Sequence, residues 1–161
     1  MKKNNNGGII VYKADQVADW FLCRKAMTPK KLQKMLYYAY AWTLTLTNDS
    51  SNNLKNKLFE EKFEAWVHGP VIPEIYHMYK DYGYNKISEQ EKLINFDNED
   101  IENILKQVML VYGDYDGNDL ESITHQEEPW KEAREGYGPL DSCSEIISDE
   151  TMYKTYIKRI A

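Results

Sequence analysis

The apolar and polar positions of the chain are organised around one stretch, TPKKLQKMLYYAYAWTLTL, which runs from Thr28 to Leu46. No charged residue lies between Met35 and Leu46, and a helix formed here would be apolar or aromatic around most of its circumference. Because such a helix must be surrounded by other elements, this stretch predicts a buried central helix. Thr28 can cap it, and Pro29 suits its first turn. Three lysines in its first half favour a protein core over a membrane span of similar length.

The segments on either side predict shorter helices and one extended piece. The range from Phe63 to His68 alternates apolar and polar residues and predicts a short strand, which Gly69 and Pro70 should break. Segment 48–57 predicts a loop, and segment 86–96 predicts a loop or a short hairpin. Apolar spacing with suitable caps and breakers predicts helices over Ala14–Lys25, Pro73–Gly83, a segment that starts at Asn98 and includes Met109, Asp116–Ile123, Glu128–Glu135 and Ser148–Ile160.

These elements predict a mainly α fold, a single compact helical domain around the buried central helix, with room for a small β-hairpin. A chain of 161 residues is the natural size for one domain and can bury enough apolar surface to need no disulfide or metal. Residues 1–8 are polar and end in glycine, so we expect a disordered tail there and the helical domain over residues 9–161.

Charge and cysteine content narrow the classes of function. The net charge of -6 and the pI of about 5.1 argue against nonspecific nucleic-acid binding, which requires a basic field. Cys23 and Cys143 share no close motif, and no apolar run of signal-peptide length follows the basic start. We therefore expect a cytoplasmic protein in a reducing compartment, with no membrane partner.

No stretch carries a recognisable catalytic or cofactor motif. The segment from Asp114 to His125 begins like a calcium loop, but its sixth position is Asp119 instead of glycine and its twelfth is histidine instead of glutamate. His68 and His125 titrate near neutral pH, yet no nucleophile can be placed beside either. We therefore expect no enzymatic activity, no metal and no cofactor. The alternative is a small enzyme that uses His125 or His68 with Glu64.

Three lysines stand at the start of the predicted central helix, where the helix dipole favours acidic residues. This broken local rule indicates that the lysines have a partner. One explanation is an ion pair with an acidic residue of the next segment, and the other is an acidic protein surface or a phosphate. The lysines are Lys30, Lys31 and Lys34, and the internal candidates are Glu60, Glu61 and Glu64.

The least generic stretch is WVHGPVIPEIY, from Trp66 to Tyr76. Its two prolines and one glycine fix a corner between the extended segment and the following helix. In that helix, the spacing turns Ile75, Tyr76, Met78 and Tyr79 toward the core. The bulky residues at the corner are either packed into the core or exposed as a preformed binding surface.

Three blocks of the chain resemble the Panacea domain, the family of SocA-like antitoxins and phage-associated GepA-like proteins. The blocks are KLQKMLYYAYAW (31–42), FEEKFEAWVHGPVIPEIYHMYKDYG (59–83) and ITHQEEPWKEAR (123–134), and their order and spacing agree with that family. By position, the motif residues are Lys31, Gln33, Tyr37, Tyr38, Trp42, Glu64, Trp66, Gly69, Pro70, Pro73, Tyr76, His125, Trp130 and Arg134.

The resemblance implies the antitoxin of a toxin–antitoxin system, which neutralises a cognate toxin, encoded beside it, by direct protein–protein binding. It also implies a second route, in which the antitoxin acts as a proteolytic adaptor and delivers the toxin to a Clp-type protease. The alternative function is a phage or mobile-element accessory protein that binds a host protein and has no toxin partner. For the partner-binding surface we expect Lys31, Lys34, Lys57, Trp66, His68, Gly69 and Pro70.

Overall fold

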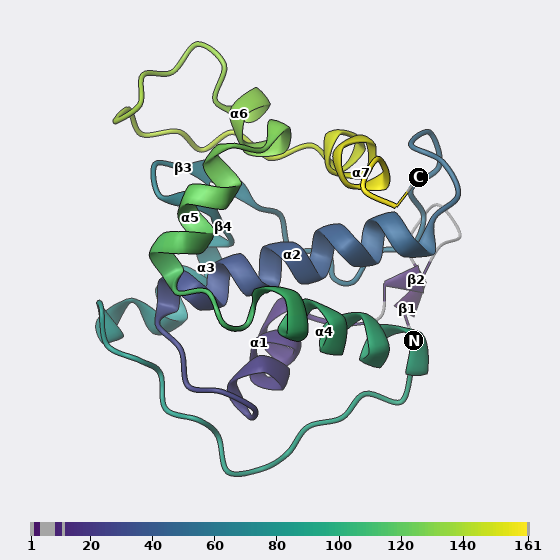
Figure 1. Ribbon diagram of the computed structural model, residues 1–161, viewed down its shortest axis with the longest axis vertical. Helices are drawn as coiled ribbons and strands as arrows, with labels where there is room; N and C mark the ends of the chain where they lie inside the picture. Colours follow the sequence, from purple (N-terminus) through teal and green to yellow (C-terminus); the bar gives the residue numbers. More distant parts are fainter. Residues whose placement is uncertain (1, 4–8, 11, 161) are drawn as a thin grey trace.

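The predicted central helix is present and organises the molecule. A computed structural model describes residues 2–3, 9–10 and 12–160, and in it α2 (Pro29–Thr47) crosses the middle of the fold (Figure 1). One side of α2 carries α1 (Ala14–Leu22) and α4 (Glu99–Tyr112), and the other carries α6 (Glu128–Ala133) and α7 (Asp149–Ile157). Helix α5 (Gly117–His125) contacts the first half of α2. The prediction of a mainly α fold is confirmed.

The sequence of α2 explains both its start and its burial. The Thr28 hydroxyl accepts a hydrogen bond from the Lys31 amide at 3.2 Å, and Pro29 occupies the first turn, as predicted. Every side chain from Lys31 to Ala41 is buried. Because helices α1, α4, α5 and α7 contact different sides of α2, its nearly continuous apolar surface is covered.

Three further helices begin at the caps that the sequence predicts. The side chains of Asn98, Asp116 and Ser148 each accept a hydrogen bond from the amide three residues later, at 3.1, 2.8 and 3.2 Å. Helix α4 follows Asn98, α5 follows Asp116 and α7 follows Ser148. Among the described residues, no helix is both long and apolar enough to cross a membrane.

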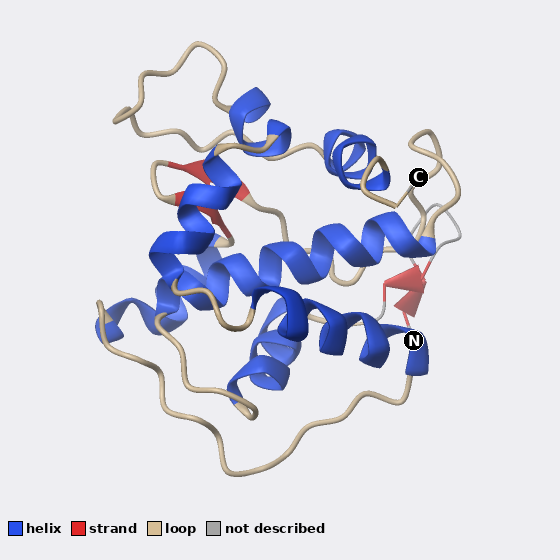
Figure 2. Cartoon of the chain, in the orientation of Figure 1, coloured by secondary structure: helices blue, strands red, loops and turns tan. Residues whose placement is uncertain are grey.

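The corner after the extended segment is a β-hairpin, and one prediction about it is wrong. Strands β3 (Glu64–Trp66) and β4 (Gly69–Val71) pair antiparallel, with Trp66 opposite Gly69 and two residues between them (Figure 2). Gly69 and Pro70 therefore continue the hairpin instead of breaking it. On the other side of β3, the Ala65 amide donates to the Glu145 carbonyl at 2.9 Å. Proline is tolerated in β4 because its missing N–H faces no partner strand.

The helix after this corner is shorter and more exposed than predicted. Helix α3 (Pro73–Tyr79) continues into the 3-10 helix η1 (Lys80–Tyr82), and Gly83 ends it with a positive φ of 57°. Ile75 is buried, but Tyr76 and Met78 are 41% and 52% exposed, so their predicted inward orientation is wrong. The helix lies at the edge of the fold, where only one of its faces is covered.

The segment before α4 and the chain start complete the fold. Segment 86–96 contains no hairpin; a β-bridge joins Ile87 to Met27, and the Gln90 amide donates to the Leu22 carbonyl at 2.9 Å. Strand β1 (Lys2–Lys3) pairs with β2 (Ile9–Ile10), although the prediction placed Lys2 and Lys3 in a disordered tail. The other residues of that predicted tail, 1 and 4–8, lie outside the described residues.

Candidate partner-binding site

Four elements converge at the first turns of α2 and enclose a hollow of about 560 Å³, which we call the α2 groove. The β3–β4 hairpin, α3 and the start of α5 contribute its walls, and Figure 1 shows these elements around the first turns of α2. Its apolar and aromatic lining consists of Trp66, Val71, Ile75, Tyr76, Tyr79 and Tyr84, and its charged lining consists of Lys30, Lys34, Lys80 and Asp116, with His68 at its edge. An aromatic hollow with a few cations is a typical recognition surface.

Lys34 lies in the lining of the α2 groove and is only 1% exposed. Its ammonium donates to the carbonyl oxygen of Pro70 at 3.3 Å, and this is its one hydrogen-bond acceptor among the described residues. Burial lowers the pKa of Lys34 to about 7, although the nearby Glu121 carboxylate acts in the opposite direction. A buried amine with one acceptor leaves hydrogen-bonding capacity unused.

Gly69 lets the hairpin approach Lys34. Its φ is +108°, a conformation that side chains rarely adopt. A Cβ at this position would lie 2.6 Å from the Lys34 Cε and 3.1 Å from the Thr124 Oγ1. A side chain at this position would be strained and would clash with Lys34, so only glycine fits.

Lys30 has an internal ion pair, but not with the predicted acids. Its ammonium lies 2.8 Å from Glu121 Oε1 on α5 and donates to Asn118 Oδ1 at 3.0 Å. His68 Nδ1 lies 3.2 Å from the same Glu121 oxygen. Burial alone would raise the pKa of Glu121, but the hydrogen bonds from Lys30 and His68 bring that pKa below its ordinary value.

Lys31 is also buried, at 7% exposed, and its ammonium donates to the Gly113 carbonyl. Burial, together with the charge of Lys25, lowers the pKa of Lys31. The predicted acids are used elsewhere: Glu61 accepts from the Ala14 amide at 2.7 Å and Glu64 accepts from the Trp66 indole at 2.9 Å. The predicted ion pairs are therefore wrong, because α2 turns these lysines toward α5 and the end of α4.

The third sequence block ties α5 and α6 to the hairpin. The Trp130 ring stacks on His125 with centroids 3.9 Å apart, and its indole N–H donates to the Trp66 carbonyl at 2.8 Å. Arg134 lies over Trp130 and donates to the Ala65 carbonyl at 2.9 Å. Burial lowers the pKa of His125, which favours the neutral form of its ring. These residues hold the groove wall in place.

Gln33 of α2 fixes the backbone directly after the hairpin. Its side-chain amide makes two hydrogen bonds with the backbone of Ile72: it accepts from the N–H at 2.9 Å and donates to the C=O at 3.1 Å. Both residues are buried. The pair sets the position of Pro73 and hence the start of α3.

A comparison with protein families identifies the family of the chain. A model of the family described as "Antitoxin SocA-like, Panacea domain" matches residues 32–131, which is well over half of the chain. The chain belongs to this SocA-like Panacea family. A comparison with curated proteins and one with solved structures each gave no match.

In this Panacea domain, the middle of α2 forms a closed aromatic cluster, which we call the Glu127 ring. It consists of Glu127, Tyr37, Tyr38, Tyr156 and Arg159. Glu127 Oε1 accepts from the hydroxyls of Tyr38 and Tyr156 at 2.7 and 3.0 Å, and Arg159 pairs with the other oxygen. Burial raises the pKa of both Tyr37 and Tyr38 well above the ordinary range. Every group of the ring has a partner inside the domain.

Trp42 continues this aromatic packing toward α4. Its indole N–H donates to the Tyr112 hydroxyl at 3.0 Å, and the Tyr112 ring stacks on Tyr38 with centroids 4.0 Å apart. Tyr37, Tyr38 and Trp42, three motif residues of the family resemblance, therefore serve the core of the Panacea domain and do not line the groove.

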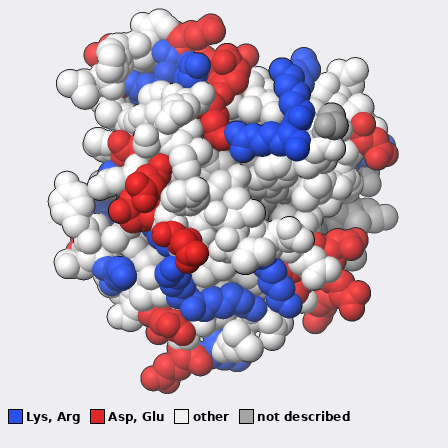
Figure 3. Space-filling model, in the orientation of Figure 1, with Lys and Arg blue, Asp and Glu red and all other residues white. Residues whose placement is uncertain are grey.

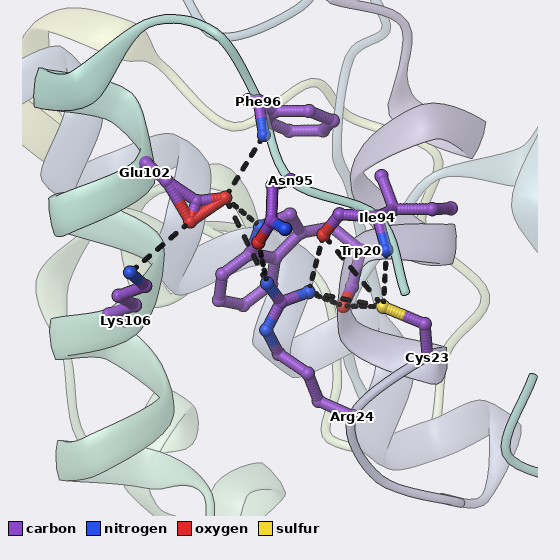
Figure 4. Close-up of polar contacts among 8 residues, drawn as sticks. All are labelled: Trp20, Cys23, Arg24, Ile94, Asn95, Phe96, Glu102 and Lys106. Carbon is purple, nitrogen blue, oxygen red and sulfur yellow. Dashed lines mark hydrogen bonds and ion pairs between the residues drawn. The ribbon is translucent and has the colours of Figure 1, made fainter. Parts of the chain in front are cut away.

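A second closed cluster lies between α1 and α4 (Figure 4). The Glu102 carboxylate accepts from the Trp20 indole at 2.6 Å and from the Phe96 amide at 3.1 Å. Arg24 lies 3.6 Å above the Trp20 ring and donates to the Ile94 carbonyl at 2.8 Å. This cluster attaches the segment before α4 to α1.

The predicted partner-binding residues do not all come together. Trp66 and His68 lie at the α2 groove, and the His68 side chain is 70% exposed. Gly69 and Pro70 are buried, and so are Lys31 and Lys34, of which only Lys34 lines the groove. Lys57 lies at the opposite end of α2, where it pairs with Asp149 at 3.1 Å. A partner that binds the groove therefore contacts Trp66 and His68 first.

Sequence reasoning missed three residues that line the groove, namely Tyr79, Lys80 and Tyr84. The signal is present in the run YHMYKDYGY, where aromatic residues recur without the aliphatic residues that a core-facing helix would carry. It also missed Glu127, Tyr156 and Arg159, because nothing local marks a glutamate that is buried by residues from two other helices.

The surface charges and possible metal ligands complete the description. Figure 3 shows acidic and basic side chains interspersed over the face in view, with uncharged surface between them. In the described ranges, no group of three or more His, Cys, Asp or Glu side chains is placed to hold a metal ion. Asp116, the third position of the calcium-like segment, caps α5 instead.

Proposed function

We propose that this protein is an antitoxin that neutralises a cognate protein toxin by binding it directly, and that it is not an enzyme. The observation that carries this proposal is the match of residues 32–131 to the SocA-like antitoxin family. The matched residues include most of the α2 groove lining, from α2, the hairpin, α3 and α5. We assign the toxin-binding surface to this groove.

The groove is suited to binding because it is rigid before the partner arrives. Gln33 holds the backbone of Ile72, and Trp130 and Arg134 hold the backbone of β3. The walls therefore lose little conformational entropy on docking. Exposed rings beside them, such as Tyr76 at 41% and Tyr84 at 95%, offer the large amphipathic contacts that dominate protein interfaces. Neutralisation then follows by occlusion of the toxin surface.

The two histidines nearest the groove are assigned structural roles. His125 lies flat on Trp130, and His68 pairs with Glu121. A double variant, Glu64→Gln with His125→Phe, keeps an acceptor for the Trp66 indole and an aromatic ring on Trp130. Neither residue lines the α2 groove, and the enzyme alternative depends on Glu64. We expect this variant to neutralise the toxin as the wild type does. Complete loss of neutralisation by the folded double variant would instead favour an enzyme.

The proposal predicts that a toxic gene lies beside this one. The test expresses that neighbour from an inducible promoter, alone and together with this protein, and follows growth. We expect growth arrest by the neighbour alone, rescue by co-expression, and a complex of the two proteins on size-exclusion chromatography. A harmless neighbour, or toxicity that this protein does not relieve, would contradict the proposal.

The same assay separates occlusion from delivery to a protease. In a host strain that lacks its Clp proteases, we expect rescue to persist and the toxin to accumulate in the complex. Rescue that disappears in that strain would show that a Clp-type protease is an obligatory partner, as in the adaptor route.

A further inference from the structure

The α2 groove is a locally basic region on an acidic protein. Its lining contains Lys30, Lys34 and Lys80 against one carboxylate, Asp116, whereas the whole chain carries a net charge of -6. The positive end of the α2 dipole points to the same place, so the helix adds to the lysine charges instead of offsetting them. A segment of negative charge is favoured here over one of positive charge.

The lysine ammonium groups differ in how fully they are satisfied. Lys30 is paired with Glu121 and Asn118, but Lys34 has only the Pro70 carbonyl at 3.3 Å within the described part of the chain. An ammonium has three donors, and burying one with a single neutral acceptor is unfavourable. A carboxylate entering the groove would provide the missing acceptors and a compensating charge.

The walls around these lysines are aromatic. The rings of Trp66 and Tyr76 meet edge to face, with centroids 5.0 Å apart, and Tyr84 projects at 95% exposed. Such rings bind apolar and aromatic side chains, and the lysines between them bind carboxylates. The combination fits a peptide segment that carries both.

A phosphate or nucleic acid fits less well. Asp116 lines the groove, and the Glu121 carboxylate pairs with both Lys30 and His68. Two carboxylates so close to the lysines repel a phosphate dianion more strongly than they repel a singly charged carboxylate. A single carboxylate among apolar side chains is therefore the better fit.

We infer that the α2 groove binds a segment of the partner protein that carries acidic and aromatic residues side by side. The aromatic residue packs between Trp66 and Tyr84, and the acidic residue pairs with Lys34 and Lys80. This inference rests on the proposed function only for the identity of the partner, because the chemistry of the groove can be tested without a toxin.

The test uses a phage-displayed library of random heptapeptides as the probe. The library is selected on the wild-type protein and depleted on a double variant, Tyr84→Ala with Lys80→Glu. Both residues are exposed, so the fold should be retained, which circular dichroism and the melting temperature check. We expect the enriched peptides to combine Asp or Glu with Trp, Tyr or Phe.

A selected peptide is then labelled with fluorescein and titrated by anisotropy. We expect the double variant to weaken its binding by roughly tenfold or more, as removal of an interface hot spot does. A matched variant on another surface, Tyr137→Ala with Lys131→Glu, should bind as the wild type does. Tyr137 is 40% exposed and Lys131 is exposed on α6.

Three outcomes would overturn the inference: enrichment of basic or purely aliphatic peptides, no enrichment over the depleted pool, or equal weakening in the matched variant. None of them depends on a toxin, so they are distinguishable from failure of the proposed function. That function fails separately, when the wild-type protein does not relieve the toxicity of the neighbouring gene product.

Discussion

Glu127 and Lys34 are both buried charged groups beside the α2 axis, and they are satisfied very differently. Glu127 accepts hydrogen bonds from two tyrosine hydroxyls and pairs with Arg159, so its carboxylate is fully used inside the molecule. Lys34 has one carbonyl at 3.3 Å and lines a groove. Burying a charge without enough partners is unfavourable, so the incomplete shell of Lys34 in the groove lining leaves room for a further acceptor.

This difference separates the parts of α2 that serve the fold from those that serve binding. The Glu127 ring holds α7 and the start of α6 against the middle of α2, and the Glu127 carboxylate and its tyrosine partners bond to one another. The α2 groove combines an undersatisfied amine with exposed rings. Changes in the ring should therefore cost stability, and changes on the groove surface should cost binding.

The largest effect on stability is expected from Glu127→Ala. It leaves the buried hydroxyls of Tyr38 and Tyr156 without their acceptor and Arg159 without its partner. Breaking one side of a buried ionic network costs about 3–5 kcal/mol. Urea denaturation measures the change in the free energy of unfolding. Glu135→Ala, at an exposed site, is the control and should stay within about 0.5 kcal/mol.

Gly69→Ala should come next. It combines a positive φ with a methyl group 2.6 Å from Lys34 Cε, and we expect a loss of about 2–4 kcal/mol from strain and overpacking. Gly136→Ala is the matched control, because Gly136 has a φ of +86° with nothing within 4 Å of the added Cβ. If both variants lose the same free energy of unfolding, the close approach to Lys34 contributes nothing to the cost of Gly69→Ala.

The pH dependence of stability tests the burial of Lys34. Its pKa is about 7 in the folded state and about 10.4 in an unfolded chain, so between these values the unfolded state binds the extra proton. Stability should therefore rise with pH across this window. From pH 7 to pH 9 the wild type should gain about 2 kcal/mol relative to Lys34→Met, measured by urea denaturation. Parallel pH profiles for the two proteins would show that Lys34 keeps an ordinary pKa.

The smallest effect on stability is expected from Tyr84→Ala. The side chain is 95% exposed, so the free energy of unfolding should change by less than about 0.5 kcal/mol. Binding of the acidic and aromatic peptide should nevertheless weaken, because the ring forms a wall of the groove. Thermal melting and anisotropy measure the two quantities on the same sample. A large fall in melting temperature would show that Tyr84 stabilises the fold instead.

The sequence alone was sufficient for the burial of α2 and for the start of four helices. The uncharged run of α2 predicted its burial, and Thr28, Asn98, Asp116 and Ser148 marked helix starts because capping depends on a side chain within three residues. The family resemblance likewise rested on contiguous blocks. These features require no knowledge of which segments meet in space.

The partners of Lys31 and Lys34 could not be predicted, because they are not acidic side chains. Lys34 binds the Pro70 carbonyl and Lys31 binds the Gly113 carbonyl, 36 and 82 residues away along the chain. Every residue has a carbonyl, so its side chain gives no sign that it will accept. The position of these lysines at the positive end of the helix dipole did indicate that they have a partner, and the structure places them at or beside the groove.

The hairpin shows a related limit. Glycine followed by proline usually ends a strand, and at Gly69 and Pro70 this local rule failed. Gly69 is needed because the backbone passes close to the Lys34 side chain. Pro70 is tolerated because residues 145–147 pair with β3 and not with β4. Both reasons involve segments that are distant in sequence.

The most direct test of the central claim compares neutralisation and stability in three proteins. They are the wild type, the groove variant Tyr84→Ala with Lys80→Glu, and the matched variant Tyr137→Ala with Lys131→Glu, each co-expressed with the toxic neighbour. We predict that the groove variant alone fails to restore growth, while all three melt within a few degrees of one another. Full rescue by the groove variant would contradict the assignment of the α2 groove as the toxin-binding surface.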